Sequence, residues 1–192
     1  MAMNFKIFES KEVADLFLAD LLRKQIHNNP ESILALDTNV ELSRSYEKLV
    51  GELRNHPADL SEIQLYAVGK DGLEVFKKLD LPSSQIDEGG TADDLDSKGK
   101  KKVNVAVLNL NDNKKVGFNN DNEDLFKAKE LFVYASGSNS SDAVRALYEA
   151  ALDGGSSLSE IKNHRMVTVV IDIDAAADLD SDIVDYYTYK FA

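Results

Sequence analysis

The amino-acid sequence predicts one α/β domain over residues 1–192, a Rossmann-like three-layer sandwich with a mostly parallel central sheet. Apolar segments of strand length alternate with amphipathic helical segments along the chain, which is the pattern of βαβ units. Val103–Leu110 is apolar except for two asparagines, as expected of a parallel strand that is buried on both faces. A length of 192 residues supports one domain with a substantial core but is short for two.

Strands and helices are expected to alternate from the N-terminus to residue 79. Ser10 is a suitable N-cap for a helix that runs to about Asn28, and Pro30 just beyond it is a typical helix stop. Leu42–Asn55 has apolar residues at helical spacing and is predicted to be a second helix. The other elements of this part are strands at Asn4–Phe8, Ser32–Leu36 and Ile63–Val68 and a short helix at Leu73–Leu79.

The composition changes between Pro82 and Lys102. This stretch has few large apolar residues, adjacent glycines and a block of acids followed by lysines, so we expect a mobile loop at 82–102. Further on, the turn Ser136–Ser141 is predicted to open a helix from about Asp142 to Leu152, closed by Asp153-Gly154-Gly155. Strands are expected at Val103–Leu110, Leu131–Ala135, Met166–Ile173 and, as an edge strand, Ile183–Phe191.

Charge and composition exclude several classes of function. The net charge of −12 argues against nucleic acid as a partner, because binding to phosphate backbones needs a basic surface. The absence of cysteine removes disulfides, thiol nucleophiles and thiolate metal sites. No apolar run approaches the roughly 18 residues of a membrane span and no signal peptide is recognisable, so we expect no membrane association and a cytoplasmic location. The aromatic stripe at 186–191 either packs on the core or pairs with a second subunit in a homo-oligomer.

Two polar turns are candidate binding sites. Asn111–Lys115 follows the central strand, where open α/β sheets bind ligands, and its lysines would attract a phosphate. Ser136–Ser141 opens a helix, whose free N–H groups and dipole favour anions. Each turn also has an ordinary interpretation, the first as an Asn-rich turn with solvated lysines and the second as helix capping by Ser140 or Ser141. The residues alone leave both interpretations open.

No metal ion or cofactor is expected. Asp178, Asp180 and Asp182 occupy the first, third and fifth places of a calcium loop, but Ile183 and Tyr189 stand where glycine and glutamate are required. The three histidines are far apart, and no glycine-rich nucleotide motif or GxSxG motif occurs. The acidic segment is therefore interpreted as a solvated turn.

Four segments, taken in order, resemble one family of enzymes. Ile33–Tyr46 resembles a strand followed by a Thr-Gly-Ser-Thr-Pro turn, a helix and a tyrosine, and Lys115–Asn119 resembles part of the signature Asp-Gly-His-Ile-Ala-Phe-Asn-Glu. Leu131–Ala146 and Val167–Ala176 resemble a later strand, turn and helix and a closing strand. In order and spacing, these segments are similar to the glucosamine-6-phosphate deaminase and 6-phosphogluconolactonase family. The resemblance implies a Rossmann-like sheet and a phosphosugar ligand.

The same resemblance implies that the catalytic set is substituted at every position that can be placed. The general base after the third strand falls on Gly69, and the Asp, His and Glu of the signature fall on Asn113, Lys115 and Asn120. Asparagine cannot abstract a proton, and a lysine is a poor substitute for histidine near neutral pH. The lysine that would hold a phosphate falls on Ser140. The candidate ligand-binding residues are Thr38, Asn39, Gly69, Asn113, Lys115, Asn119, Asn120, Gly137, Ser138 and Ser140.

Two functions fit these observations. The first is a non-catalytic protein that binds a sugar phosphate or a partner protein, because substitution at every catalytic position suggests that catalysis was abandoned. The alternative is an active phosphosugar isomerase, deaminase or lactonase of carbohydrate metabolism with a rearranged site, in which Lys115 or Asp112 is the acid–base group. A protein that binds only a partner protein would be distinguished by a hydrophobic patch around Tyr186–Phe191.

Overall fold

The computed structural model describes residues 2–68, 73–88, 102–116 and 125–189. Its centre is a sheet of seven strands in the order β1-β7-β6-β5-β2-β3-β4, in which every neighbouring pair is parallel. The predicted α/β class and central parallel sheet are therefore confirmed. The strands are β1 (Ala2–Phe8), β2 (Ile33–Asp37), β3 (Gln64–Val68), β4 (Ile86–Asp87), β5 (Val105–Asn109), β6 (Glu130–Ala135) and β7 (Met166–Asp172).

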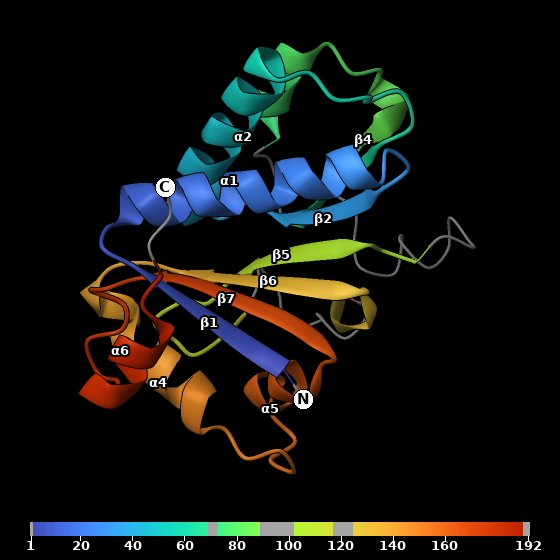
Figure 1. The fold of residues 1–192 in the computed structure, drawn as a ribbon. Coiled ribbons are helices and arrows are strands. Elements are labelled where there is room, and N and C mark those ends of the chain that lie inside the picture. Colours follow the sequence, from blue (N-terminus) through green and yellow to red (C-terminus); the bar gives the residue numbers. More distant parts are fainter. Residues whose placement is uncertain (1, 69–72, 89–101, 117–124, 190–192) are drawn as a thin grey trace.

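Helices cover both faces of the sheet and make the predicted three layers (Figure 1). One outer layer holds α1 (Lys11–Asn28) and α2 (Ser43–Asn55). The other holds α4 (Ser141–Glu149), α5 (Ser157–Asn163) and α6 (Ser181–Tyr187). Short 3-10 helices lie in the connections at η1 (Val40–Leu42), η2 (Glu74–Leu79), η3 (Ser83–Gln85), η4 (Leu125–Lys127) and η5 (Ser138–Ser140).

The central strand β5 buries its side chains on both faces. Val105 and Val107 pack with the core under α1 and α2, whereas Ala106 and Leu108 pack with the core on the opposite face. All four side chains are fully buried, which explains why this strand is apolar without alternation. Helix α1 begins as predicted, because the hydroxyl of Ser10 accepts the N–H of Val13.

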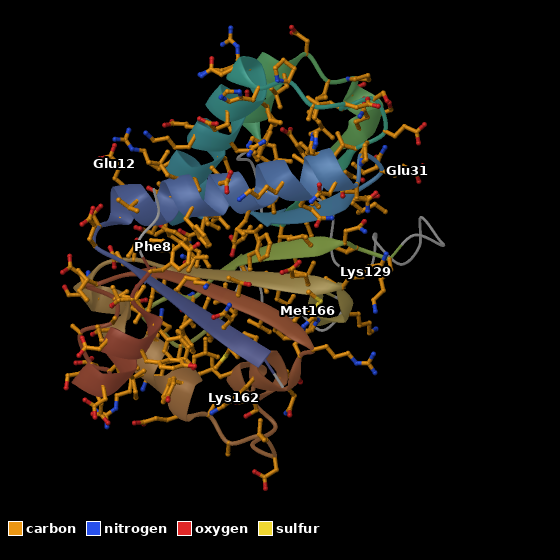
Figure 2. The ribbon with its side chains drawn as sticks, viewed as in Figure 1. Phe8, Glu12, Glu31, Lys129, Lys162 and Met166 are labelled. Carbon is orange, nitrogen blue, oxygen red and sulfur yellow. The ribbon has the colours of Figure 1, made fainter. Side chains whose placement is uncertain are left out.

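The direction of the connections reverses between β2 and β5. From β2 the chain proceeds to β3 and β4 at one edge, and from β5 it proceeds through β6 to β7, towards the other edge. In open α/β sheets, ligands bind outside the carboxyl ends of the two strands at such a topological switch point. In Figure 2 the label of Phe8 marks the carboxyl end of β1, and the label of Met166 marks the amino end of its neighbour β7.

The prediction of a C-terminal edge strand at Ile183–Phe191 is wrong. This segment contains helix α6, and Thr188 beyond it makes only an isolated parallel bridge to Ile7. Ile183, Val184 and Tyr187 pack against the core, and their spacing fits one face of a helix. The tyrosines favoured a strand in the sequence because aromatic residues are enriched in strands. Residues 190–192 lie outside the described residues.

The first part of the segment 82–102, where a mobile loop is expected, contains regular secondary structure. It contains η3 and β4, and β4 pairs with β3. The buried amide of Gln85 donates hydrogen bonds to the carbonyl oxygens of Leu60 (2.7 Å) and Ile63 (2.8 Å), so a polar side chain anchors a segment that is poor in apolar residues. Residues 89–101 lie outside the described residues.

The boundaries after β6 also differ from the prediction. Helix α4 ends at Glu149 instead of near Leu152, because Ala150 has an extended ψ of 132°. The sequence-based prediction contained no helix at α5, which begins where the hydroxyl of Ser156 accepts the N–H of Ser159. A short helix of 7 residues carries too few apolar positions for its periodicity to be recognised before the packing partner is known.

Candidate functional site

Asp37 and Asn109 join the two strands at the switch point. The carboxylate of Asp37, at the end of β2, accepts the backbone N–H of Asn109, at the end of β5, at 2.9 Å. Its other oxygen accepts the N–H of Asn39 at 2.9 Å, and the hydroxyl of Tyr46 donates to the carbonyl oxygen of Asp37 at 2.6 Å. Burial raises the pKa of Asp37 from 3.8 to about 6, although the N–H groups of Asn109 and Asn39 oppose this shift.

A second buried carboxylate, that of Asp15, lies on the inner face of α1. One of its oxygens accepts hydrogen bonds from the hydroxyls of Tyr134 (2.6 Å) and Ser45 (2.8 Å), and the ammonium of Lys11 lies 3.5 Å away. Its other oxygen is buried without a hydrogen-bond partner in the described part of the chain. Burial, with the hydrogen bond and charge of Asp15, raises the pKa of Tyr134 well above its ordinary value, so this hydroxyl remains a donor.

Lys11 and Glu41 form the solvent-facing part of this arrangement, and the buried Ser136 lies beside them. The Lys11 ammonium donates to the hydroxyl oxygen of Tyr134 (2.9 Å) and to the carbonyl oxygen of Glu41 (3.0 Å). The Glu41 carboxylate accepts the Ser136 hydroxyl at 3.0 Å and lies 3.8 Å from the Lys11 ammonium. A cation and a hydroxyl donor thus hold an anionic group from the same chain. We call these residues and the two carboxylates behind them the switch-point cluster (Lys11, Asp15, Asp37, Glu41, Asn109, Tyr134 and Ser136).

The turn after β6 is held from behind by β7. The carboxylate of Asp172 accepts the N–H of Gly137 at 3.0 Å and that of Ala175 at 2.9 Å. Gly137 has φ 77°, a left-handed conformation in which side chains are unfavourable. Ser140 occupies the N-cap position of α4, but its hydroxyl donates to the carbonyl oxygen of Ser136. The hydroxyl of Ser141 donates to Asp178, so neither serine caps the helix through a side-chain hydrogen bond.

The turn after β5 closes on itself. The side-chain oxygen of Asn111 accepts the N–H groups of Asn113 and Lys115, each at 3.1 Å. Lys114 has φ 58° and therefore adopts a left-handed conformation that glycine favours. Its ammonium lies 2.8 Å from the carboxylate of Asp142, which brings this turn to the first turn of α4.

The predicted ligand-binding residues lie in three neighbouring loops at the carboxyl edge of the sheet. Thr38 faces β3, because its hydroxyl and N–H donate to the carbonyl oxygen of Val68. Asn39 is engaged with its own loop, since its side-chain oxygen accepts the N–H of Glu41. Asn113, Lys115 and Ser138 have exposed side chains. The predicted residues Gly69, Asn119 and Asn120 lie outside the described residues.

Sequence reasoning missed Asp15, Lys11 and Tyr134 as members of a polar cluster. Asp15 was detectable in principle, because it is a charged residue at a helix position whose neighbours Ala14 and Leu18 belong to the core. Lys11 and Tyr134 offered no such signal. Their hydrogen bond joins residues that are 123 positions apart in the chain, and only the packing of α1 on β6 brings them together.

The described part of the chain contains neither a cluster of metal-ligating side chains nor a membrane-spanning helix. Among those residues, no group of three or more His, Asp and Glu side chains is placed to hold a metal ion. None of the helices within the described ranges is long and apolar enough to cross a bilayer.

Comparison with known proteins relates the chain to solved structures. No model of a protein family matches the sequence, and no curated protein sequence matches it. Its structure is similar to that of a monomeric glucosamine-6-phosphate deaminase, with a TM-score of 0.74 and 17% identity over 91% of this chain and 99% of that one. The 6-phosphogluconolactonase of Leishmania guyanensis is similar with a TM-score of 0.70 and 16% identity, over 94% of this chain and 100% of that one. The 6-phosphogluconolactonase of Trypanosoma brucei is similar with a TM-score of 0.73 and 10% identity, over 93% of this chain and 99% of that one. At these identities the likeness establishes the fold, and it confirms the predicted resemblance at that level.

Proposed function

We propose that this chain binds a sugar phosphate at the switch-point cluster and does not catalyse its conversion. The observation that carries the proposal is that Lys11 and Ser136 hold the carboxylate of Glu41 at the carboxyl edge of the sheet. A phosphate group has the same sign of charge and offers more acceptor oxygens, so it suits the same cation and hydroxyl. The phosphosugar class is supported by the names of the similar structures, a glucosamine-6-phosphate deaminase and several 6-phosphogluconolactonases.

The non-catalytic part of the proposal is supported by the burial of two of the three carboxyl groups of the cluster, those of Asp37 and Asp15. Asp37 is 0% exposed and Asp15 is 1% exposed, and a general base must come within hydrogen-bond reach of the proton that it removes. The alternative acid–base groups, Asp112 and Lys115, are exposed. Within the described residues, neither side chain makes a hydrogen bond or an ion pair with the switch-point cluster.

Binding can be tested by thermal unfolding and titration calorimetry with glucosamine 6-phosphate, fructose 6-phosphate, 6-phosphogluconate and ribose 5-phosphate. Inorganic phosphate serves as the control for the sugar. A ligand at 100 times its dissociation constant stabilises the folded state by about 2.7 kcal/mol, so a selective increase in Tm is expected for one sugar. Incubation with that sugar should give no product. Turnover of the sugar would contradict the proposal that the chain is non-catalytic. The absence of binding at millimolar concentrations would contradict the proposal that its ligand is a sugar phosphate.

A matched pair of variants tests whether the phosphate group binds at Lys11. Lys11→Met removes the cation of the cluster, whereas Lys78→Met removes an exposed cation on η2. A charge-assisted hydrogen bond contributes about 1.5–3 kcal/mol, so Lys11→Met should weaken sugar-phosphate binding at least about tenfold. Lys78→Met should bind as the wild type does. Equal affinities of both variants would show that the phosphate binds elsewhere.

A further inference from the structure

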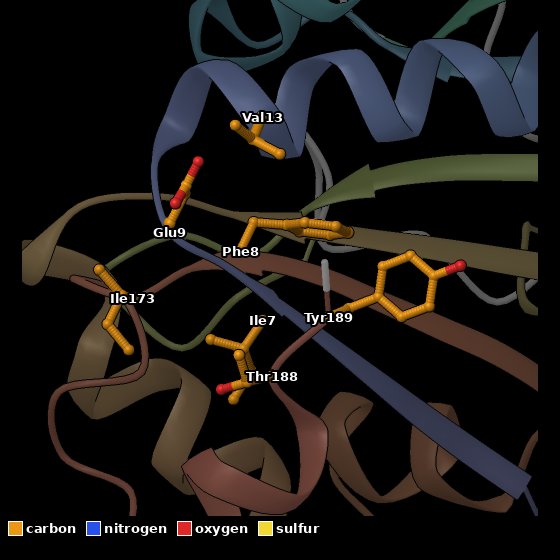
Figure 3. A pocket seen from close by; sticks show the side chains of 7 residues that line it. All are labelled: Ile7, Phe8, Glu9, Val13, Ile173, Thr188 and Tyr189. Carbon is orange, nitrogen blue, oxygen red and sulfur yellow. The ribbon is translucent and has the colours of Figure 1, made fainter. Parts of the chain in front are cut away.

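A cavity of about 580 Å³ lies at the carboxyl ends of the edge strand β1 and its neighbour β7 (Figure 3). Small-molecule sites in proteins have volumes of about 300–1,000 Å³, so this hollow is large enough for a ligand. It is distinct from the switch-point cluster, with which it shares no lining residue. We call it the edge cavity, and it is lined by Ile7, Phe8, Glu9, Val13, Ile173, Thr188 and Tyr189.

The apolar wall of the edge cavity is held in place. Ile7 and Phe8 form its buried part, each 1% exposed, while Ile173 and Tyr189 are 42% and 40% exposed. The ring of Tyr189 packs edge-on against Phe8 at 5.8 Å between centroids, and its backbone N–H donates to the carbonyl oxygen of Ile7 at 2.8 Å. Large apolar side chains that border a hollow and are fixed by such contacts are suited to cover a ligand without rearrangement.

Glu9 is the polar group of the cavity that remains free to bind. Among the other lining residues, Thr188 and Tyr189 carry hydroxyl groups, and Thr188 donates its hydroxyl to the carbonyl oxygen of Val184 at 2.7 Å. The carboxylate of Glu9 is exposed and makes no hydrogen bond or ion pair with the described residues. Figure 3 shows Glu9 and Ile173 on one side of Phe8 and Tyr189 on the other. The carboxylate and the ring of Tyr189 therefore lie on opposite sides of Phe8.

The charges around the cavity select the sign and orientation of the ligand. The chain carries a net charge of −12, which attracts cations and repels anions. The ammonium of Lys6 lies 4.4 Å from the centre of the Tyr189 ring and would repel a second cation at that end. A positive group therefore belongs at Glu9, and an apolar group belongs at Tyr189.

We propose that the edge cavity binds a small primary amine with an aromatic or branched apolar body. Its ammonium pairs with the Glu9 carboxylate, and its body covers Phe8, Ile173 and Tyr189. Binding buries the exposed parts of Ile173 and Tyr189 and neutralises a carboxylate that has no partner in the described part of the chain. This site is independent of sugar-phosphate binding.

The proposal can be tested with three probes that share a phenylethyl or benzyl body and differ in charge. These are 2-phenylethylamine, 2-phenylethanol and phenylacetate, each titrated at low salt while backbone amide resonances are followed by NMR. We expect shifts at Ile7, Val13, Ile173 and Tyr189, with the amine binding about fivefold more tightly than the alcohol and phenylacetate more weakly than both. Equal affinities of the three probes, or shifts confined to other residues, would overturn the proposal.

Three variants distinguish the contribution of the ammonium group to the affinity from that of the apolar body. Glu9→Gln should remove the preference for the amine while it leaves the affinity for the alcohol unchanged, and Glu47→Gln, on the exposed face of α2, should leave both affinities unchanged. Ile173→Trp should reduce binding of both probes by filling the cavity. A preference for the amine that survives in Glu9→Gln, or undiminished binding to a folded Ile173→Trp, would contradict the proposed contacts.

Discussion

Two regions at the carboxyl edge of the sheet differ in how their polar groups are satisfied. In the switch-point cluster, the carboxylates of Asp37, Asp15 and Glu41 each accept donors from the same chain. At the edge cavity, the carboxylate of Glu9 accepts none from the described residues, and Ile173 and Tyr189 remain partly exposed. The switch point is where open α/β sheets bind ligands, yet the chain has occupied much of it with its own hydrogen bonds.

The comparison separates groups that contribute to the stability of the fold from groups that contribute little to it. Removing one partner of a buried hydrogen bond leaves the other unpaired, which costs free energy of folding. An exposed group without a partner contributes little to folding, so its replacement alters binding alone. Changes in the cluster should therefore alter the free energy of unfolding, whereas changes at the cavity rim should not.

The largest effect on the free energy of unfolding is expected from the titration of Asp37. The folded state retains this proton up to about pH 6, whereas the unfolded chain releases it near pH 3.8. The resulting stability is present below pH 3.8 and is lost as the pH rises through about 6, a loss of about 3 kcal/mol from this group. Urea unfolding between pH 4 and pH 7 measures it, as the difference between the wild type and Asp37→Asn.

The matching control for this measurement is Asp112→Asn, which removes an exposed carboxyl group after β5. As a substitution at an exposed side chain, it should change the free energy of unfolding by less than about 0.5 kcal/mol. If Asp37→Asn also follows the wild type, the carboxyl group of Asp37 does not hold its proton as the buried geometry requires.

A smaller loss of folding stability is expected from Tyr134→Phe. The variant removes the hydroxyl that donates to Asp15 and accepts from Lys11, and it leaves a buried carboxylate with fewer donors. We expect the free energy of unfolding to fall by about 1–3 kcal/mol. Tyr186→Phe makes the same chemical change at a side chain that is 80% exposed and should have almost no effect. Equal denaturation midpoints of the two variants would contradict the importance of the buried hydroxyl.

Glu41→Gln should make the switch-point cluster more accessible to phosphate. The variant removes the negative charge that Lys11 and Ser136 hold, while it keeps the size of the side chain. Because Glu41 is half-exposed, we expect an increase in sugar-phosphate affinity of about fivefold, measured by calorimetry. Glu47→Gln serves as the control for the loss of one charge. An unchanged affinity in Glu41→Gln would mean that Glu41 does not compete with the ligand.

The smallest effect is expected at the rim of the edge cavity. Ile173→Ser replaces an apolar side chain that is 42% exposed, so the free energy of unfolding should change by less than about 0.5 kcal/mol. Binding of 2-phenylethylamine should nevertheless weaken in the same variant. A large loss of stability would show that Ile173 supports the fold and is not merely available to a ligand.

Local pattern was enough to predict most elements and the class of the fold. The periodicities of α1, α2 and the internal strands were read correctly because their buried faces repeat over several turns or residues. Segments with few apolar positions were predicted poorly. Helix α5, strand β4 and helix α6 depend on contacts with distant parts of the chain, as the hydrogen bonds of Gln85 illustrate.

The loops that carry the candidate site were predicted in part. The sequence predicts Thr38, Asn39 and Gly137 as binding residues, and these residues lie in loops around the switch-point cluster. The hydrogen bonds of Thr38, Asn39 and Gly137 to Val68, Glu41 and Asp172 were not predictable, because each joins the residue to a partner whose position depends on the backbone geometry of these loops.

By itself, the sequence determined the alternation of strands and helices, the parallel sheet and the capped start of α1, because these follow from short-range spacing. The tertiary structure decided which strands are neighbours, and with that the meeting of Lys11, Asp15, Glu41 and Tyr134 at the switch point. It also decided that α6 is a helix and that Glu9 faces a hollow. The physical reason is that burial and hydrogen-bond partners are properties of the packed chain, and they are absent from any single segment.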